Sequence, residues 1–259
     1  MYIDTHCHLE MVDGEFPRAV VERAIDAGVD TMLTVGVDLA SSAECVQTAG
    51  AVPVVWAVVG IHPHNAIEAT EAVIGRLAQL AEHPRVVGIG ETGLDYYRDH
   101  SPNDQQRAAF RAHIDLAKQL DKALVIHCRD AHADVLDILD DKGAPERVVF
   151  HCFSGDTEFA KRCAANGWYM SFSGTVTFLN APVLRDAAAT VPPELLLTET
   201  DAPYLSPHPH RGETNEPSRV SLVAATLAEL HGMTGEQMGQ LTSANARRAF
   251  ALPAPADAA

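Results

Sequence analysis

The chain alternates short apolar runs with longer amphipathic segments. Eight runs rich in Val, Ile and Leu predict strands at Tyr2–His6, Thr31–Val35, Val54–Val59, Val86–Gly90, Ala123–His127, Arg147–His151, Gly167–Ser171 and Glu194–Thr198. Helical periodicity between them predicts helices that include Phe16–Ala27, Ala66–Glu82, Gln105–Leu120, Ala131–Asp140 and Thr157–Ala165. Because nearly continuous apolar strands separated by helices are typical of parallel strands buried on both faces, we expect an α/β protein.

Eight strand–helix units are the number that closes a TIM-type (β/α)8 barrel. We expect a single-domain barrel over residues 1–251, with helices Pro217–His231 and Thr234–Phe250 outside it and a flexible Pro/Ala-rich tail over residues 252–259. An open doubly wound sheet is the alternative, but it usually carries a glycine-rich turn after the first strand. Here that position holds His6, Cys7 and His8.

The composition is that of an ordinary globular protein, with 47% hydrophobic and 21% charged residues in 259. No signal-peptide pattern is present and no apolar run reaches the roughly 18 residues of a membrane span, so we expect a cytoplasmic protein without membrane contact. The five cysteines are odd in number and lack CxxC spacing. They predict small buried side chains rather than a disulfide framework.

The net charge is −16, from 35 acidic and 19 basic residues. This balance disfavours a protein that binds nucleic acid through a broad basic face, because such binding depends on neutralising phosphates. It leaves open an enzyme that reaches a phosphodiester through bound cations.

Chemically active side chains follow five of the predicted strands. They are His6 and His8 after the first strand, Glu91 after the fourth, His127 after the fifth, His151 after the sixth and Asp201 after the eighth. Taken singly, each has an alternative. His6 and His8 could be a chance surface pair, and His127 and His151 could be buried structural histidines. Glu91 could cap a helix, and Asp201 could be a turn residue. Because a barrel of this type carries its chemistry at the carboxyl ends of its strands, the set as a whole predicts a metal site there.

Six ligands exceed what one tetrahedral ion requires, so we expect two divalent ions. Glu91 is the natural bridge, since a carboxylate can bind two cations where a neutral imidazole cannot. His6, His8 and Asp201 would hold one ion, and His127 and His151 the other. The candidate metals are zinc, manganese and magnesium, and mixed imidazole and carboxylate ligands suit magnesium least.

Five strings along the chain are similar to those of a known family. The strings are DTHCHLE, GIGETGLDYY, HCRDA, HCFSG and ETDAPYL, and the similarity runs from Tyr2 to Phe250. The chain thereby resembles the TatD family of metal-dependent deoxyribonucleases, within the amidohydrolase superfamily. The resemblance implies hydrolysis of DNA phosphodiesters, often as an exonuclease, and places the family's metal ligands on the same six residues. It also implies a DNA substrate, single-stranded or at strand ends.

The chain departs from the family pattern at two places. Glu10 replaces the Asp that often ends the first string. In the segment from Arg211 to Pro217, the family pattern resembles RGKRNEP, and two basic positions are here Glu213 and Thr214. Fewer positive charges beside the site predict weaker binding of a long polyanionic strand.

The expected chemistry is attack of a metal-bridging hydroxide on phosphorus, with Glu91 and Asp201 as catalytic residues and Asp201 as general base. The candidate substrate-binding residues are His64, Arg129, Arg211 and Asn215. A solvated loop position remains open for His64, and an ion pair with Asp130 or Asp134 for Arg129.

Two other functions fit the same residues. A small-molecule hydrolase acting on an amide, a lactone or an aminoacyl ester would use the same two-metal site. A non-catalytic metal-binding protein is the second alternative, and it would be expected to have lost some of the six ligands. The sequence does not indicate an oligomeric state.

Overall fold

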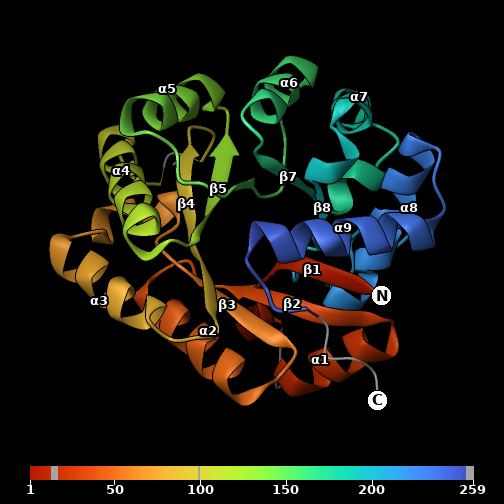
Figure 1. Ribbon diagram of the computed structural model, residues 1–259, viewed down its shortest axis with the longest axis horizontal. Helices are drawn as coiled ribbons and strands as arrows, with labels where there is room; N and C mark the ends of the chain where they lie inside the picture. Colours follow the sequence, from red (N-terminus) through yellow and green to blue (C-terminus); the bar gives the residue numbers. More distant parts are fainter. Residues whose placement is uncertain (13–16, 99, 255–259) are drawn as a thin grey trace.

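Eight parallel strands form one sheet in sequential order, β1 to β8 (Figure 1). The computed structural model describes residues 1–12, 17–98 and 100–254. The strands are β1 Tyr2–Cys7, β2 Val29–Val35, β3 Val55–Val59, β4 Val86–Asp95, β5 Ala123–Arg129, β6 Val148–Phe150, β7 Tyr169–Phe172 and β8 Leu196–Thr198. Between the first and last strands, a parallel bridge pairs Cys7 with Ala202, and the His8 N–H donates to the Ala202 carbonyl at 2.7 Å. The predicted TIM-type barrel is therefore confirmed.

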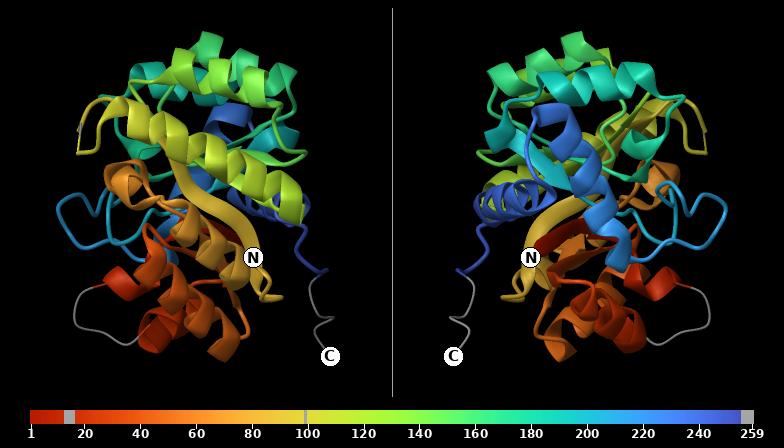
Figure 2. Two further views of the ribbon diagram at one scale, coloured as in Figure 1. Left: turned by 90° about the vertical axis from the view of Figure 1, so that its left-hand side faces the viewer. Right: turned by 90° about the vertical axis from the view of Figure 1, so that its right-hand side faces the viewer.

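The helices surround the sheet as an outer layer (Figures 1 and 2). They are α1 Pro17–Asp26, α2 Leu39–Ala51, α3 Glu71–Ala81, α4 Asn103–Leu120, α5 His132–Lys142, α6 Thr157–Ala165, α7 Pro182–Thr190, α8 Val220–His231 and α9 Gly235–Ala249. Short 3-10 turns follow several strands. None of the helices within the described ranges is long and apolar enough to cross a membrane. The Phe16 end of the first predicted helix lies outside the described residues.

Helix α9 does more than pack against the outside of the barrel. Ala246, Ala249 and Phe250, at its end, join one buried cluster with Ile3 of β1 and Leu197 of β8. The Asn245 amide also donates to the Leu196 carbonyl at 2.8 Å, at the start of β8. Since these contacts lie at the amino ends of the strands, α9 covers the end of the barrel opposite the carboxyl ends.

The packed part of the chain continues to at least Leu252, which we expected to lie in a flexible tail. Leu252 is buried in the cluster that α9 covers, and its N–H donates to the Arg247 carbonyl. The predicted flexible tail therefore does not begin at residue 252, because an apolar side chain is available there to fill the end of the barrel. The rest of that prediction, for residues 255–259, lies outside the described residues.

Strand β4 extends five residues beyond its predicted end at Gly90 and reaches Asp95. Gly93, with φ of 138°, lies against the backbone of His127 on β5, and a Cβ there would overlap the His127 carbonyl oxygen. A glycine is required at this point because only glycine readily adopts such a φ and allows so close an approach. Two of the expected metal ligands, Glu91 and His127, lie on this strand pair.

Replacing Gly93 by Ala should lower the free energy of unfolding by more than about 2 kcal/mol, because strain and overlap act together. The matched control is Gly75→Ala in α3, where nothing lies within 4 Å of the added Cβ. That control should stabilise the protein by about 0.5–1 kcal/mol through helix propensity. Chemical denaturation checks both values, and equal effects of the two substitutions would contradict the account.

Candidate metal centre

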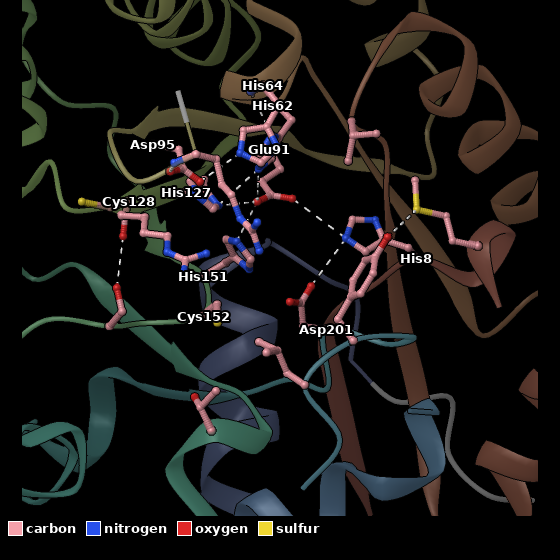
Figure 3. Close-up of a pocket in the computed structure, with 18 of the residues that line it drawn as sticks. His8, His62, His64, Glu91, Asp95, His127, Cys128, His151, Cys152 and Asp201 are labelled. Atoms are coloured by element: carbon pink, nitrogen blue, oxygen red, sulfur yellow. Dashed lines mark hydrogen bonds and ion pairs between the residues drawn. The ribbon is translucent and has the colours of Figure 1, made fainter. Parts of the chain in front are cut away.

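The six expected ligands lie together at the carboxyl ends of the strands. Five of them line one pocket with a volume of about 680 Å³, and Figure 3 shows them with several neighbours. His6 and His8 come from the end of β1, Glu91 from within β4, His127 from β5, His151 from the turn after β6 and Asp201 from the loop after β8. His6 lies beneath the pocket, fully buried, with its ring stacked on that of His151 at 3.9 Å between centroids.

Glu91 occupies the centre of this arrangement. Its Oε1 lies 2.9 Å from Nδ1 of His127 and 2.8 Å from Nε2 of His151. Its Oε2 lies 3.3 Å from Nε2 of His6 and 4.0 Å from Nε2 of His8. Each oxygen of this carboxylate therefore faces two of the expected imidazole ligands, which is the geometry that a bridging ligand needs.

Asp201 completes the β1 side of the site. Its Oδ1 lies 3.5 Å from Nε2 of His8 and 3.9 Å from Nε2 of His6. Its own N–H donates to the His6 carbonyl at 2.9 Å, which fixes the loop after β8 against β1. His6, His8 and Asp201 form one of the groups whose ligand atoms lie close enough together to hold a metal ion.

In three of the histidines, the outer ring nitrogen, which points away from Glu91 and Asp201, contacts an oxygen atom. The inner ring nitrogen is the one that points toward these carboxylates. Nδ1 of His8 donates to the Val35 carbonyl at 2.7 Å, and Nε2 of His127 donates to Asp95 at 3.1 Å. Nδ1 of His151 faces Glu199 at 3.3 Å. In the absence of a metal ion, each inner nitrogen can donate to Glu91 or Asp201 only if the ring carries a second proton. In the neutral tautomers that the outer contacts select, each inner nitrogen would instead direct a lone pair toward these carboxylates. Lone pairs that face carboxylate oxygens require a positive charge between them, which a divalent cation supplies.

His6 gives a second indication that the site binds a cation. It is fully buried, and neither of its ring nitrogens forms a hydrogen bond among the described residues. A buried polar atom without a partner costs free energy, so native proteins rarely leave one. Imidazole nitrogens and carboxylate oxygens are also the donors that transition metals and zinc prefer. The residues present therefore fit divalent metal ions.

The two carboxylates are ionised despite their burial. Burial by itself would raise the pKa of Glu91, but the charges of His151 and His62 and hydrogen bonds from His127 and His151 lower it well below its ordinary value. Burial likewise opposes ionisation of Asp201, whose pKa is lowered by a hydrogen bond from His8 and by the charges of His151 and His6. Both side chains therefore present negative charge to a cation.

Three polar residues of the site were missed in the sequence. His62, after β3, places Nε2 3.3 Å from Oε1 of Glu91, and it forms a candidate metal-binding group with Glu91 and His127. Asp95 orients His127, and Glu199 orients His151 while accepting the Cys152 N–H at 2.7 Å. All three lie at or just after strand ends, so the rule that found the six ligands would also have found His62 and Glu199.

Two of the four candidate substrate-binding residues line the pocket. They are His64, whose Nε2 bonds Asp95 at 3.0 Å, and Arg129, whose guanidinium lies over the Tyr97 ring. Arg211 lies outside the pocket, over the Phe178 ring, in a neighbouring shallow hollow. Near it, Glu213 pairs with Arg219 at 2.7 Å, which neutralises the acidic position that departs from the family pattern.

Asn215 does not lie at the substrate pocket, where we expected it. It is fully buried, and its amide donates to the carbonyls of Thr200 and Tyr204 at 2.9 and 2.7 Å. It does not line the pocket, so the expected contact with substrate is corrected to a structural role. A buried amide that bonds two carbonyls holds the loop that carries Asp201.

Replacing Asn215 by Ala should lower the free energy of unfolding by about 2–3 kcal/mol, because the buried Thr200 carbonyl and the partly buried Tyr204 carbonyl lose their donor. The matched control is Asn166→Ala, which removes an amide that bonds the exposed Arg162 carbonyl. That control should change stability by less than about 0.5 kcal/mol. Thermal or chemical denaturation measures both, and similar values would show that Asn215 does not hold the loop.

The cysteines near the site are not positioned as nucleophiles. Burial raises the pKa of Cys152 to about 12 and holds that of Cys7 well above its ordinary value. A thiolate is the reactive form of cysteine, so these thiols are inert near neutral pH. The sequence-based expectation of small buried side chains fits Cys7, whereas Cys152 is half-buried and lines the pocket.

Imidazoles and carboxylates converge at the carboxyl end of a parallel β/α barrel, which is the arrangement expected of a metal-dependent barrel enzyme. The family model described as TatD related DNase matches residues 3–251. The chain therefore belongs to the TatD family, as the motifs indicated.

Individual relatives agree with this assignment. An uncharacterized metal-dependent hydrolase named TatD, from Mycobacterium tuberculosis, is 45% identical over 96% of this chain and 98% of its own length. A protein named 3'-5' ssDNA/RNA exonuclease TatD from Erwinia billingiae is 39% identical over 91% of this chain and 93% of its own length. The crystal structure of YJJV, a TatD homologue from Escherichia coli, has a TM-score of 0.91 at 29% identity and covers 97% of this chain and 98% of its own.

Proposed function

We propose that this protein is a divalent-metal-dependent deoxyribonuclease that removes nucleotides from the ends of single-stranded DNA. The observation that carries the proposal is the set of inner imidazole nitrogens that face Glu91 and Asp201. Membership of the TatD family supports a phosphodiester as the substrate, as does the relative named as an exonuclease.

The arrangement of ligands supports two ions that share Glu91. His6, His8 and Asp201 would hold the first ion together with Oε2 of Glu91. His127 and His151 would hold the second with Oε1 of Glu91, and His62 lies beside the same oxygen. Bound divalent ions would lower the pKa of a water molecule and offset the negative charge of the phosphoryl oxygens.

The protein's own groups perform the proton transfer and the orientation. Oδ1 of Asp201 faces His8 and His6, whereas no hydrogen bond or ion pair among the described residues involves Oδ2. Asp201 is ionised and lines the pocket, so Oδ2 can accept the proton of the attacking water as general base. Asp95 and Glu199 fix the rings of His127 and His151 and thereby hold Glu91 at the centre.

A small-molecule hydrolase is the second candidate. A specific observation favours it: part of the pocket wall is apolar, with Met11, Leu184 and Leu205 among the lining residues. The cavity of about 680 Å³ is also of the size that accepts small ligands. The net charge of −16 is unfavourable for holding a long strand but not for a small neutral ester.

Metal-reconstituted protein assayed on two sets of substrates distinguishes the candidates. One set contains single-stranded DNA oligonucleotides, and the other contains carboxylic esters, lactones and amides. We expect kcat/KM for the oligonucleotides to exceed that for every member of the second set by at least 100-fold. A higher kcat/KM on any ester, lactone or amide would contradict the proposal and favour the second candidate.

A further inference from the structure

Three side chains on one side of the pocket form a stack. The guanidinium of Arg129 lies 4.0 Å from the centroid of the Tyr97 ring, and that of Arg98 lies 5.6 Å from it. Both arginines line the pocket, and they are the permanently cationic side chains among its described lining residues. We refer to Arg98, Tyr97 and Arg129 as the arginine stack.

The arginine stack has no acidic partner within residues 1–12, 17–98 and 100–254. Neither guanidinium there forms an ion pair or a hydrogen bond. Asp134 was one of the two partners expected for Arg129. It instead pairs with Arg107 at 2.8 Å and accepts a hydrogen bond from Tyr96 at 2.6 Å. The chain has 35 acidic and 19 basic residues, yet neither guanidinium pairs with a carboxylate of the described residues. Both guanidiniums face the pocket and are available to an anionic ligand.

The arginine stack is fixed to the metal centre through one carboxylate. Oδ1 of Asp95 accepts the N–H groups of Tyr97 and Arg98 at 3.0 and 2.9 Å, and its Oδ2 accepts from His127 at 3.1 Å. Figure 3 shows Asp95 beside His127. Arg129 follows His127 by two residues on β5, so the two side chains leave the same face of the strand about 7 Å apart.

We propose that the arginine stack is a second anion subsite, which binds the phosphate next to the scissile phosphate of a nucleotide strand. This inference rests on the proposed nuclease function and names its substrate class: chains with at least two phosphates, in preference to an isolated phosphodiester. Each guanidinium can donate two parallel hydrogen bonds to phosphate oxygens. The Tyr97 ring restricts the guanidinium of Arg129, 4.0 Å from its centroid, before the substrate binds, which reduces the entropy lost on binding.

Steady-state kinetics with two substrates test the subsite. The first substrate is a single-stranded oligonucleotide, and the second is bis(p-nitrophenyl) phosphate, which has one phosphodiester and no neighbouring phosphate. In the double variant Arg98→Gln/Arg129→Gln, the KM for the oligonucleotide should rise about 30-fold, because the charge-assisted hydrogen bonds to phosphate can no longer form. The ratio of kcat/KM for the oligonucleotide to kcat/KM for bis(p-nitrophenyl) phosphate should fall by a similar factor.

Salt provides an independent readout of the same interactions. For the oligonucleotide, the dependence of log KM on log salt concentration should weaken in the double variant by about 0.7 for each phosphate that the protein no longer neutralises. The control is Arg76→Gln, which removes one arginine charge from an exposed position on α3 outside the pocket. The control should leave the substrate ratio and the salt slope within twofold of the wild-type values.

The outcomes separate this inference from the proposed function. An equal fall of kcat/KM for both substrates would assign the arginines to the scissile phosphate and overturn the inference alone. If the double variant leaves both the ratio of the two kcat/KM values and the salt slope unchanged, the inference is also overturned, and the proposed function is not affected. If the metal-reconstituted wild-type protein cleaves neither phosphodiester, the proposed function fails and the inference fails with it.

Discussion

Replacement of Asp201 by Asn should lower kcat for oligonucleotide cleavage about 1,000-fold, within the range that a general base contributes. The substitution keeps the size of the side chain but removes the carboxylate that accepts the proton. His6, His8 and Glu91 remain in place, with Oε2 of Glu91 still facing both imidazoles, so most of the metal should stay bound. Rapid-quench kinetics and elemental analysis of the same preparation measure both quantities.

The matched control for this substitution is Asp186→Asn, which removes a carboxylate from an exposed position on α7. Its kcat should stay within twofold of wild type. Turnover of Asp201→Asn within tenfold of wild type would contradict the role of Asp201 as base. Loss of metal in proportion to the loss of activity would contradict it too, because Asp201 would then act as a ligand alone.

Replacement of Glu91 by Gln should abolish stable metal binding. The carboxylate faces the imidazoles of the four expected histidine ligands and that of His62. It is the expected bridge between two ions, and a neutral amide cannot neutralise two cations. For the wild-type protein, metal at 100 times its Kd should stabilise the fold by about 2.7 kcal/mol. For a chain of this length, that corresponds to a rise of roughly 5–10 °C in Tm.

In Glu91→Gln the rise in Tm on adding metal should fall below about a quarter of the wild-type rise, since most of the differential binding is lost. Glu44→Gln, at an exposed position of α2, is the matched control and should keep the full rise. Differential scanning calorimetry with and without metal measures both. A full rise in Tm for Glu91→Gln would exclude Glu91 as the bridge.

The barrel could be predicted from the sequence because its signal is local. Each strand is a short run such as Val55–Val59, buried almost completely, and each helix shows apolar residues at helical spacing. Eight such units leave few topologies, and the structure confirms the barrel. The position of α9 was not predictable in this way, because its apolar face shows that it packs but not which surface it covers.

The residues of the site could be predicted from the sequence where the ends of the strands were predicted correctly. All six expected residues meet around Glu91 and Asp201, and their role in holding metal stays a prediction. Asp95 was missed because β4 was expected to end at Gly90, so Asp95 was not recognised as a strand-end residue. The buried position of Asn215 depends on how the loop after β8 folds over itself, and no periodic pattern records that.

Metal titration of the apoprotein, followed by digestion of end-labelled single-stranded DNA, tests the central claim most directly. The account predicts no cleavage without metal and a rate that rises until two divalent ions are bound per chain. It also predicts mononucleotides as the first products. Two bound ions without cleavage of DNA, or cleavage of equal rate in the metal-free protein, would contradict it.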